Sequence, residues 1–266
     1  MKVRGILFLA IAFGLNSCQW GKPNNPKADT TKDTLAYTYK TIKERAADCG
    51  NKPDSGCTVV KIIYPIFNYQ PTLNDTINYK LANLFTFDKT STDLQEYTKR
   101  FLAGYDRFRK HDKRSSLFFT LANHAKILRQ DSSLTTLEIS GYSFQGGAHG
   151  NSITTFINWN TKSEKNIYLK DILKDNYKAQ LTAIADTIFR KQEKLSDTAS
   201  LAKDYFFKDS KFALNENFSI TPLGIKFLYN QYEIKPYAAG QTDLFIPYAR
   251  IRSLLKPNTV ITQYLK

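Results

Sequence analysis

The chain has 266 residues, of which 42% are hydrophobic and 14% aromatic, and its formal net charge is +14. This size and apolar content predict a globular protein of one or two domains with a substantial core. The positive charge favours polyanionic surroundings and disfavours cationic partners.

The first residues have the pattern of a lipoprotein signal peptide, which we place at residues 1–17. A short basic region precedes the apolar run Gly5–Leu15, which is too short to span a bilayer. The run ends in Leu15-Asn16-Ser17-Cys18, which resembles the bacterial lipobox, in which cleavage leaves Cys18 as a lipid-modified N-terminus. An ordinary secretory signal that happens to contain a cysteine is the alternative.

Residues 18–33 are polar and rich in Pro, Asn and Thr, which predicts a flexible tether between the lipid and the folded part. Gln19 is neutral and no acidic cluster follows soon, so we expect a cell-envelope protein that faces the periplasm. Loss of Lys2 and Arg4 with the signal peptide lowers the net charge by two, from +14 to +12. Export and the lack of an arginine-rich cluster argue against a nucleic-acid partner.

Three cysteines are an odd number for an exported protein. Assignment of Cys18 to lipid leaves Cys49 and Cys57, which are separated by a loop rich in turn-forming residues. A structural disulfide is favoured in an oxidising envelope. A redox-active pair is the alternative, although such pairs usually have two intervening residues.

Two strands and two helices are predicted next. Leu35–Arg45 and Thr58–Tyr69 are the strands, and Pro65 indicates an edge or a bulge in the second. The first helix covers about Thr72–Phe85, and the second opens at Thr92-Asp93-Leu94-Gln95, a possible capping box. The second helix carries an apolar stripe typical of a core-facing helix: Leu94, Tyr97, Phe101, Tyr105 and Phe108.

Three further strands follow in the middle of the chain. Two are Leu117–Gln130 and Leu134–Phe144. In the second, the apolar side chains switch from one face of the strand to the other at Gly141, which indicates a β-bulge. The third strand alternates after a glycine-rich turn, through Ile153, Thr155, Ile157 and Trp159.

In the last part of the chain we expect a helix of about five turns, a hairpin, a strand and a short helix. The long helix has an apolar face, made by Tyr177, Leu181, Ile184 and Ile188. The hairpin turns at residues 221–224, the strand is Thr242–Pro247, and the short helix is Tyr248–Leu255. The fold class is therefore α+β, with mostly antiparallel sheets and two consecutive modules, at residues 34–110 and 111–266.

The string YSFQGGAHG, residues 142–150, is the most unusual in the chain. It lacks the lysine and the Ser or Thr of a phosphate-binding loop, and it leads into a strand, whereas phosphate loops open a helix. Gly146, Gly147 and Gly150 are expected to allow positive φ in a tight connection. His149 is favoured as a structural or ligand-contacting residue over a catalytic base, because no nucleophile motif accompanies it.

No cofactor or metal is predicted. The only histidines are His111, His124 and His149, and they do not have metal-ligand spacing. For His124, inside an apolar segment, a hydrogen-bonded strand histidine is the simplest interpretation.

Several strings resemble the domain shared by the anti-sigma factor RsiV and the peptidoglycan deacetylase PdaC. They are residues 144–150 (FQGGAHG), 156–159 (FINW), 169–173 (LKDIL), 217–224 (NFSITPLG), 232–240 (YEIKPYAAG) and 246–248 (IPY). The amino-terminal half, with VKIIYP at residues 60–65, is similar to the module usually found before that domain. The resemblance covers about Leu35 to Leu255 and implies an α+β fold outside the cytoplasm.

The resemblance also implies ligand binding, since the anti-sigma member is a lysozyme receptor. The anti-sigma member's sigma-binding segment and membrane span, and the deacetylase's catalytic domain, are not expected here. We therefore expect a non-enzymatic envelope lipoprotein, anchored to the membrane by its N-terminal lipid. Its ligand would be a protein such as a lysozyme-like hydrolase, or cell-wall glycan, although the positive charge disfavours a cationic lysozyme. The competing hypothesis is a hydrolase or transferase acting on peptidoglycan.

A candidate binding surface is predicted at Tyr229, Tyr232 and Tyr237. They lie in an irregular segment, YNQYEIKPY, where binding residues tend to occur. His149 would complete this surface if the fold brings the two loops together. The alternative is that these tyrosines cover the core.

Overall fold

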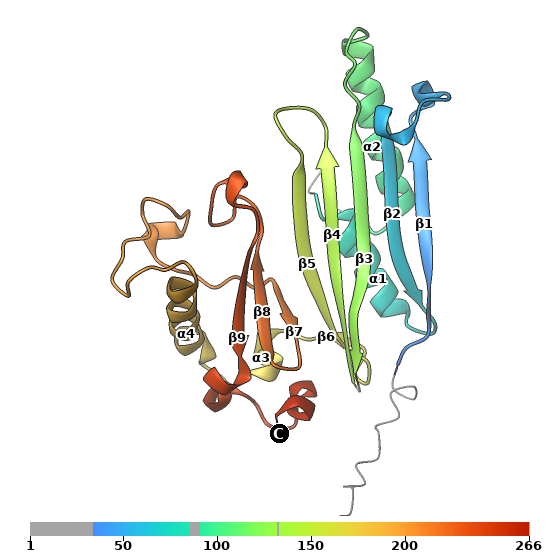
Figure 1. Ribbon diagram of the computed structural model, residues 1–266. Helices are drawn as coiled ribbons and strands as arrows, with labels where there is room; N and C mark the ends of the chain where they lie inside the picture. The colour runs from blue at the N-terminus through green and yellow to red at the C-terminus, as the bar shows by residue number, and fades with distance from the viewer. Residues whose placement is uncertain (1–33, 86–90, 132, 266) are drawn as a thin grey trace, which may run out of the picture.

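The computed structural model of the protein describes residues 34–85, 91–131 and 133–265. Two β-sheets stand side by side, and each has its own hydrophobic core (Figure 1). Helices pack on sheets that are largely antiparallel, which confirms the α+β fold class. The predicted signal peptide, the tether and Cys18 lie outside the described residues.

The first sheet contains six strands whose spatial order is their chain order. They are β1 (Tyr37–Arg45), β2 (Val59–Phe67), β3 (Thr120–Asp131), β4 (Leu134–Phe144), β5 (Asn151–Asn160) and β6 (Lys165–Asn166). Neighbouring strands are antiparallel except β2 and β3, which are parallel. A parallel pair needs a crossover connection. Helices α1 (Pro71–Ala82) and α2 (Leu94–His111) supply it and cover one face of the sheet (Figure 1).

This crossover moves the boundary between the two modules. We expected the boundary between residues 110 and 111, but β3 returns beside β2 and continues the same sheet. The first core accordingly includes residues from Ile42 to Trp159. The second core draws mainly on residues from Ile167 onward, so the modules divide after β5 and β6.

Helix α2 forms as its apolar spacing predicts. Its N-cap is Asp93, whose carboxylate accepts hydrogen bonds from the backbone N–H groups of Gln95 and Glu96, so Thr92 is not the capping residue. The predicted stripe faces the first core, where Leu94, Tyr97, Phe101 and Tyr105 are buried and Phe108 is partly buried.

The β-bulge predicted at Gly141 is wrong. Gly141 pairs in regular register with Asn123 on one side and Ile153 on the other, and the register shift of this sheet lies on β3, between Ile127 and Arg129. A Cβ at Gly141 would collide with Asn123 and stand 2.6 Å from a methyl group of Leu84. The glycine is needed to give the segment after α1 room against the sheet.

Pro65 lies in the part of β2 that pairs with a neighbouring strand on one side only. The parallel pairing of β2 with β3 ends at Ile63, whereas pairing with β1 continues to Phe67. Pro65 therefore removes no bond from the β2–β3 ladder, which agrees with the edge position that a strand proline requires.

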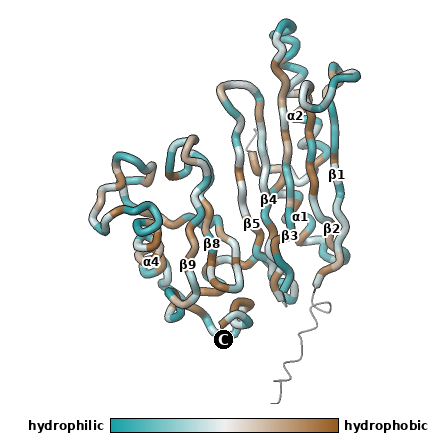
Figure 2. Tube along the Cα trace, viewed as in Figure 1, coloured by the Kyte–Doolittle hydropathy of each residue, from teal (hydrophilic) through white to brown (hydrophobic). Residues whose placement is uncertain are grey.

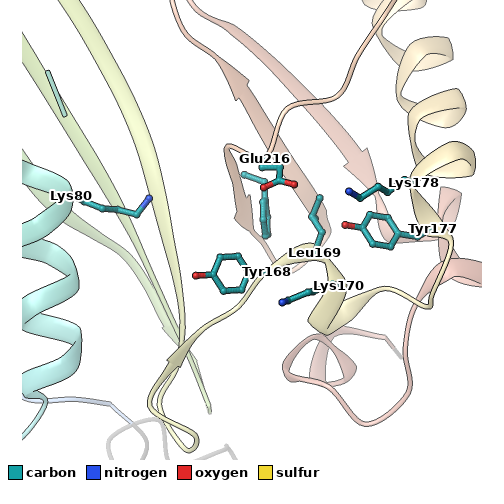
Figure 3. A pocket seen from close by; sticks show the side chains of 8 residues that line it. Lys80, Tyr168, Leu169, Lys170, Tyr177, Lys178 and Glu216 are labelled. Atoms are coloured by element: carbon teal, nitrogen blue, oxygen red, sulfur yellow. The ribbon is translucent and has the colours of Figure 1, made fainter. Parts of the chain in front are cut away.

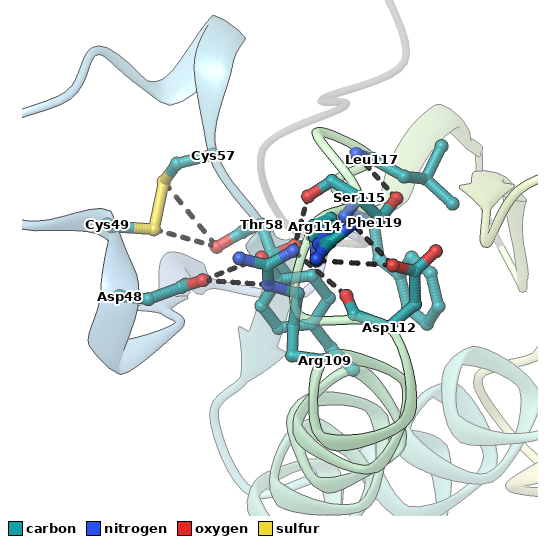
Figure 4. Close-up of polar contacts among 11 residues, drawn as sticks. Asp48, Cys49, Cys57, Thr58, Arg109, Asp112, Arg114, Ser115, Leu117 and Phe119 are labelled. Atoms are coloured by element: carbon teal, nitrogen blue, oxygen red, sulfur yellow. Dashed lines mark hydrogen bonds and ion pairs between the residues drawn. A yellow bond between two sulfur atoms is a disulfide. The ribbon is translucent and has the colours of Figure 1, made fainter.

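Cys49 and Cys57 form a disulfide, with Cα atoms 5.4 Å apart (Figure 4). A 3-10 turn, Ala47–Cys49, leads into the loop that they close, and a second, Asp54–Gly56, lies within that loop. Asp48 ties this loop to α2, since it accepts a hydrogen bond from the Tyr105 hydroxyl at 2.9 Å and pairs with Arg109 at 3.4 Å. The loop is thus held against the C-terminal end of α2.

The second sheet has three antiparallel strands, β7 (Phe218–Ile220), β8 (Gly224–Tyr229) and β9 (Thr242–Pro247). The β7–β8 hairpin confirms the predicted turn at residues 221–224. Helices α3 (Leu169–Ile172) and α4 (Tyr177–Gln192) precede it, and α4 buries Leu181, Ala185 and Phe189. Hydrophobic segments lie mainly on the strands and helices, and the loops are largely polar (Figure 2).

The short helix predicted at Tyr248–Leu255 is replaced by 3-10 turns, at residues 248–250 and 252–254, with another at 260–264. Two more 3-10 turns lie at residues 208–210 and 237–239. Among the residues that the structure describes, no helix has the length and apolarity needed to cross a membrane.

Asparagine side chains join the two modules along the outer edge of β5. The buried side chain of Asn158 donates to the carbonyl of Phe218 and accepts from the N–H of Ile220, both at 2.8 Å. The Asn158 amide thereby pairs with β7 as a neighbouring strand would. These bonds fix how the second module sits against the first.

Candidate ligand-binding surface

The β4–β5 loop, residues 145–150, requires its glycines for two different reasons. Gly146 and Gly147 have φ of 101° and 93°, which confirms the predicted positive φ. Gly150 has no positive φ, which corrects the expectation for this residue. A Cβ at Gly150 would overlap the ring of Tyr142, so the glycine lets that ring pack against the loop.

His149 stands exposed in this loop, and both of its ring nitrogens have partners. Nδ1 lies 3.0 Å from the carbonyl oxygen of Gly150, and Nε2 lies 3.2 Å from the hydroxyl oxygen of Tyr232. Because a carbonyl oxygen only accepts, Nδ1 carries a proton, and in the neutral ring Nε2 accepts from the Tyr232 hydroxyl. The histidine is therefore oriented by two polar contacts, one of them from the second module.

Three rings meet at this point. The rings of His149 and Tyr237 are stacked, with centroids 3.7 Å apart and planes 15° from parallel. The Tyr232 ring lies 6.0 Å from His149 and 5.6 Å from Tyr237. We call these three residues the aromatic patch. Tyr232 is 54% exposed and Tyr237 is partly buried, so the patch presents ring surface to solvent.

Tyr229 does not belong to the patch. It is the last residue of β8, it is only 1% exposed, and its hydroxyl donates to the carbonyl of Ala213 at 2.8 Å. Burial raises the pKa of this hydroxyl. The alternation of Ile225, Phe227 and Tyr229 places all three on the core side of the strand, so the prediction of an exposed Tyr229 was wrong.

A network around Thr154 of β5 brings the two loops of the patch together. The side chain of Asn230 accepts from the Thr154 N–H at 2.8 Å and donates to its carbonyl at 3.0 Å. Asn217 donates to the same carbonyl, and Gln241 donates to the Asn230 side chain. Sequence reasoning missed these residues, although asparagines at positions 215, 217 and 230 are an unusual concentration of side chains able to cap an edge strand.

Charged neighbours of the patch are engaged within the protein. The Glu233 carboxylate accepts from the Asn215 side chain at 2.7 Å and from the Asn230 N–H at 2.8 Å. Lys235 pairs with Glu193 at 2.9 Å. Glu233 and Lys235 are thus already held by groups of the protein itself. A binding partner would contact mainly aromatic rings and backbone.

A hollow of about 360 Å³ adjoins the patch on the side of the first module. It is open to solvent and includes His149 in its lining. The other lining residues are Phe85, Ser143, Gln145, Gly146, Asn151 and Ile153.

The other histidines do not join this surface. His124 lies on β3, as expected, and its ring is 6.4 Å from that of Tyr39; burial lowers the pKa of His124. His111 ends helix α2. Within the described ranges, no group of three or more His, Cys, Asp or Glu side chains could hold a metal ion.

Comparison with known families agrees with this division of the fold. Residues 51–152 match the family model described as deacetylase PdaC, and residues 170–249 match DUF3298, described as a protein of unknown function. The first module thus resembles the PdaC family, and the second resembles DUF3298. This confirms the resemblance inferred from the sequence. His149 lies in the region that the PdaC model matches, and both patch tyrosines lie in the region that the DUF3298 model matches.

Two solved structures share the fold over most of their length. A DUF3298 family member from Bacteroides fragilis is 23% identical, with a TM-score of 0.68, and the match covers 87% of this chain and 98% of that one. A DUF3298 family protein from Pseudomonas aeruginosa is 24% identical, with a TM-score of 0.69 and coverage of 85% and 96%. At these identities the likeness concerns the fold alone. No curated protein matches the chain.

Proposed function

We propose that this protein is a non-enzymatic lipoprotein of the cell envelope that binds another protein through the aromatic patch. The observation that carries the proposal is the meeting of His149, Tyr232 and Tyr237 from two modules at an exposed position. Such a surface exists only when both modules are in place. It is a composite site rather than a property of either sheet.

The chemistry of the patch favours a protein ligand. Interface cores are enriched in aromatic residues and depleted in charge, and tyrosine is one of the side chains that contribute most to affinity. The patch has three rings, and the nearby Glu233 and Lys235 already have partners. The stacking and the His149–Tyr232 hydrogen bond also order the rings before a partner arrives, which lowers the entropy cost of binding.

The envelope location is supported by two features. The sequence begins with a lipobox-like segment that ends at Cys18. Cys49 and Cys57 form a disulfide, and structural disulfides persist in oxidising compartments.

Capture of envelope proteins by the purified chain tests the proposal. Replacement of a central interface tyrosine typically costs about 2 kcal/mol, so Tyr232→Ala should weaken capture of the partner about 30-fold. His149→Ala should also weaken it. Tyr69→Ala is the matched control, because Tyr69 is 96% exposed and lies in the turn before α1.

Both patch variants should keep the melting temperature of the wild type. Loss of stability in step with loss of binding would show that the rings only cover the core. Capture of wall glycan, but of no protein, would also contradict the proposal.

The competing proposal, a hydrolase or transferase, is tested by assaying the purified protein on peptidoglycan. Turnover that survives His149→Ala but is lost on replacement of one Asp or Glu would favour the enzyme.

A further inference from the structure

A groove opens between the two modules, where α1 faces α3, α4 and β7 (Figure 3). Its volume is about 490 Å³, within the range of roughly 300–1,000 Å³ that small-molecule sites occupy. It is lined by Lys80, Tyr168, Leu169, Lys170, Tyr177, Lys178, Glu216 and Phe218. We propose that this groove binds a carboxylate-bearing saccharide.

Three ammonium groups surround the groove and point to an anionic ligand. Lys80, Lys170 and Lys178 come from α1, α3 and α4, and among the described residues none of them has a carboxylate within ion-pair distance. Lysines on three separate elements form the same wall only because the modules pack together. Of the described residues that line the groove, three are lysines and one, Glu216, is acidic, so this lining has an excess of positive charge.

Lys80 is the least solvated of the three. Among the described residues its Nζ has one polar contact, the Thr155 hydroxyl at 3.4 Å, and burial lowers the pKa of Lys80. A partly buried ammonium without a counter-charge is costly. A ligand carboxylate placed beside Nζ would compensate this charge, whereas a neutral ligand would desolvate it further.

The remaining lining suits a sugar better than a bare anion. Tyr168 is 53% exposed, and in Figure 3 its side chain and that of Lys80 point toward one another across the groove. Leu169 and Phe218 are buried and provide an apolar base. A pyranose has apolar C–H faces that pack on an aromatic ring, and its hydroxyl or amide N–H groups would donate to the Glu216 carboxylate.

A second hollow continues the groove and provides space for another ring. It measures about 390 Å³ and shares Tyr168 and Lys170 with the first. Thr72 and Thr76 line it and, with Lys80, follow each other at four-residue intervals on one face of α1. Trp159 also lines it, and its indole N–H has no acceptor among the described residues although the side chain is only 1% exposed. The two hollows together have room for a disaccharide.

This inference does not depend on the aromatic patch. The groove is lined by α1, α3, α4 and β7, whereas the patch is formed by the β4–β5 loop and the β8–β9 connection. The two sites would take different ligands, and a variant of one leaves the other intact.

Titration calorimetry with two disaccharides tests the inference. One is the N-acetylglucosamine–N-acetylmuramic acid disaccharide, and the other is N,N′-diacetylchitobiose, which lacks the lactyl carboxylate. The acidic disaccharide should bind about tenfold more tightly, as expected for one charge-assisted contact, and the difference should shrink at high salt. Lys80→Met and Tyr168→Ala should each lower its affinity about tenfold.

The controls are Lys203→Met, an exposed lysine outside the groove, and Tyr232→Ala in the patch, and both should bind the acidic disaccharide like the wild type. If Lys80→Met fails to fold, Lys178→Met replaces it, because Lys178 is exposed. Equal binding of the two disaccharides, no binding of either, or unchanged affinity in the groove variants would overturn the inference. Displacement of the acidic disaccharide by an equal concentration of inorganic phosphate would overturn it as well.

Discussion

Replacement of Asn158 by leucine should separate the contribution of the module junction from that of the two cores. Asn158 is 4% exposed on β5, and its side chain exchanges two hydrogen bonds with the backbone of β7. Leucine has a similar size but can neither donate nor accept. The carbonyl of Phe218 and the N–H of Ile220 would then lack their partners in a buried position.

The size of the effect follows from these two groups. A buried polar group without a partner costs about 1–3 kcal/mol, so two groups cost about 2–6 kcal/mol. Burial of the leucine side chain offsets about 1–2 kcal/mol of this. With mid-range values of about 4 kcal/mol lost and about 1.5 kcal/mol regained, we expect Asn158→Leu to lower the free energy of unfolding by about 2.5 kcal/mol.

Urea unfolding followed by circular dichroism measures this loss. Small-angle X-ray scattering in native buffer reports whether the modules still pack together. Asn51→Leu is the matched control, because Asn51 is exposed in the disulfide loop. An unfolding midpoint of Asn158→Leu equal to that of the wild type, with unchanged scattering, would refute the view that this amide joins the modules.

Three further predictions concern the first module. Gly141→Ala should cost about 1–3 kcal/mol in urea unfolding, since its Cβ would stand 2.6 Å from Leu84. Gly104→Ala on α2 should not destabilise, because its Cβ would meet only the Arg107 guanidinium, at 3.9 Å. The protein purified without reductant should contain no free thiol at Cys49 or Cys57, and reactive thiols there would contradict the disulfide. Replacement of both cysteines by serine should lower the free energy of unfolding by about 2–3 kcal/mol, because the loop is no longer constrained. Burial raises the pKa of Tyr97 from 10.0 to about 12, so the unfolded state loses the hydroxyl proton at a lower pH than the folded state. The free energy of unfolding should therefore fall as pH rises from 10 to 12. If Tyr97→Phe lost stability over this pH range as the wild type does, the assignment would be wrong.

Local periodicity predicted the elements well. The stripe from Leu94 to Phe108 determines both that α2 is a helix and which face it buries. The alternation from Ile153 to Trp159 likewise predicted β5, and the turn at residues 221–224 predicted the β7–β8 hairpin. These features depend on neighbours in the chain, and spacing alone reveals them.

Features that depend on contacts between residues far apart in the sequence could not be predicted from local patterns. The parallel pairing of β2 with β3 spans two helices, and no residue in either strand specifies it, so the module boundary was placed too early. Gly141 was assigned to a bulge because parity along one strand does not reveal the bulk of Leu84 behind it.

The candidate surface was predicted in part. Its loops were identified by their irregular composition, and the fold brings His149 to Tyr232 and Tyr237. Tyr229 was misassigned although its alternation with Phe227 was visible. The groove around Lys80 was not predicted, because its walls come from four elements that meet only after both modules have folded.

The edges of the first sheet are protected in different ways, and this bears on how the protein can be divided. The outer edge of β1 carries charged side chains at Lys40, Lys43 and Arg45, which discourage another strand from pairing there. The outer edge of β5 relies on the second module, whose asparagines pair with the Thr154 backbone. A fragment ending after β6 would expose this backbone to other chains. We therefore expect the isolated first module to self-associate through β5, because the second module covers this edge in the whole protein.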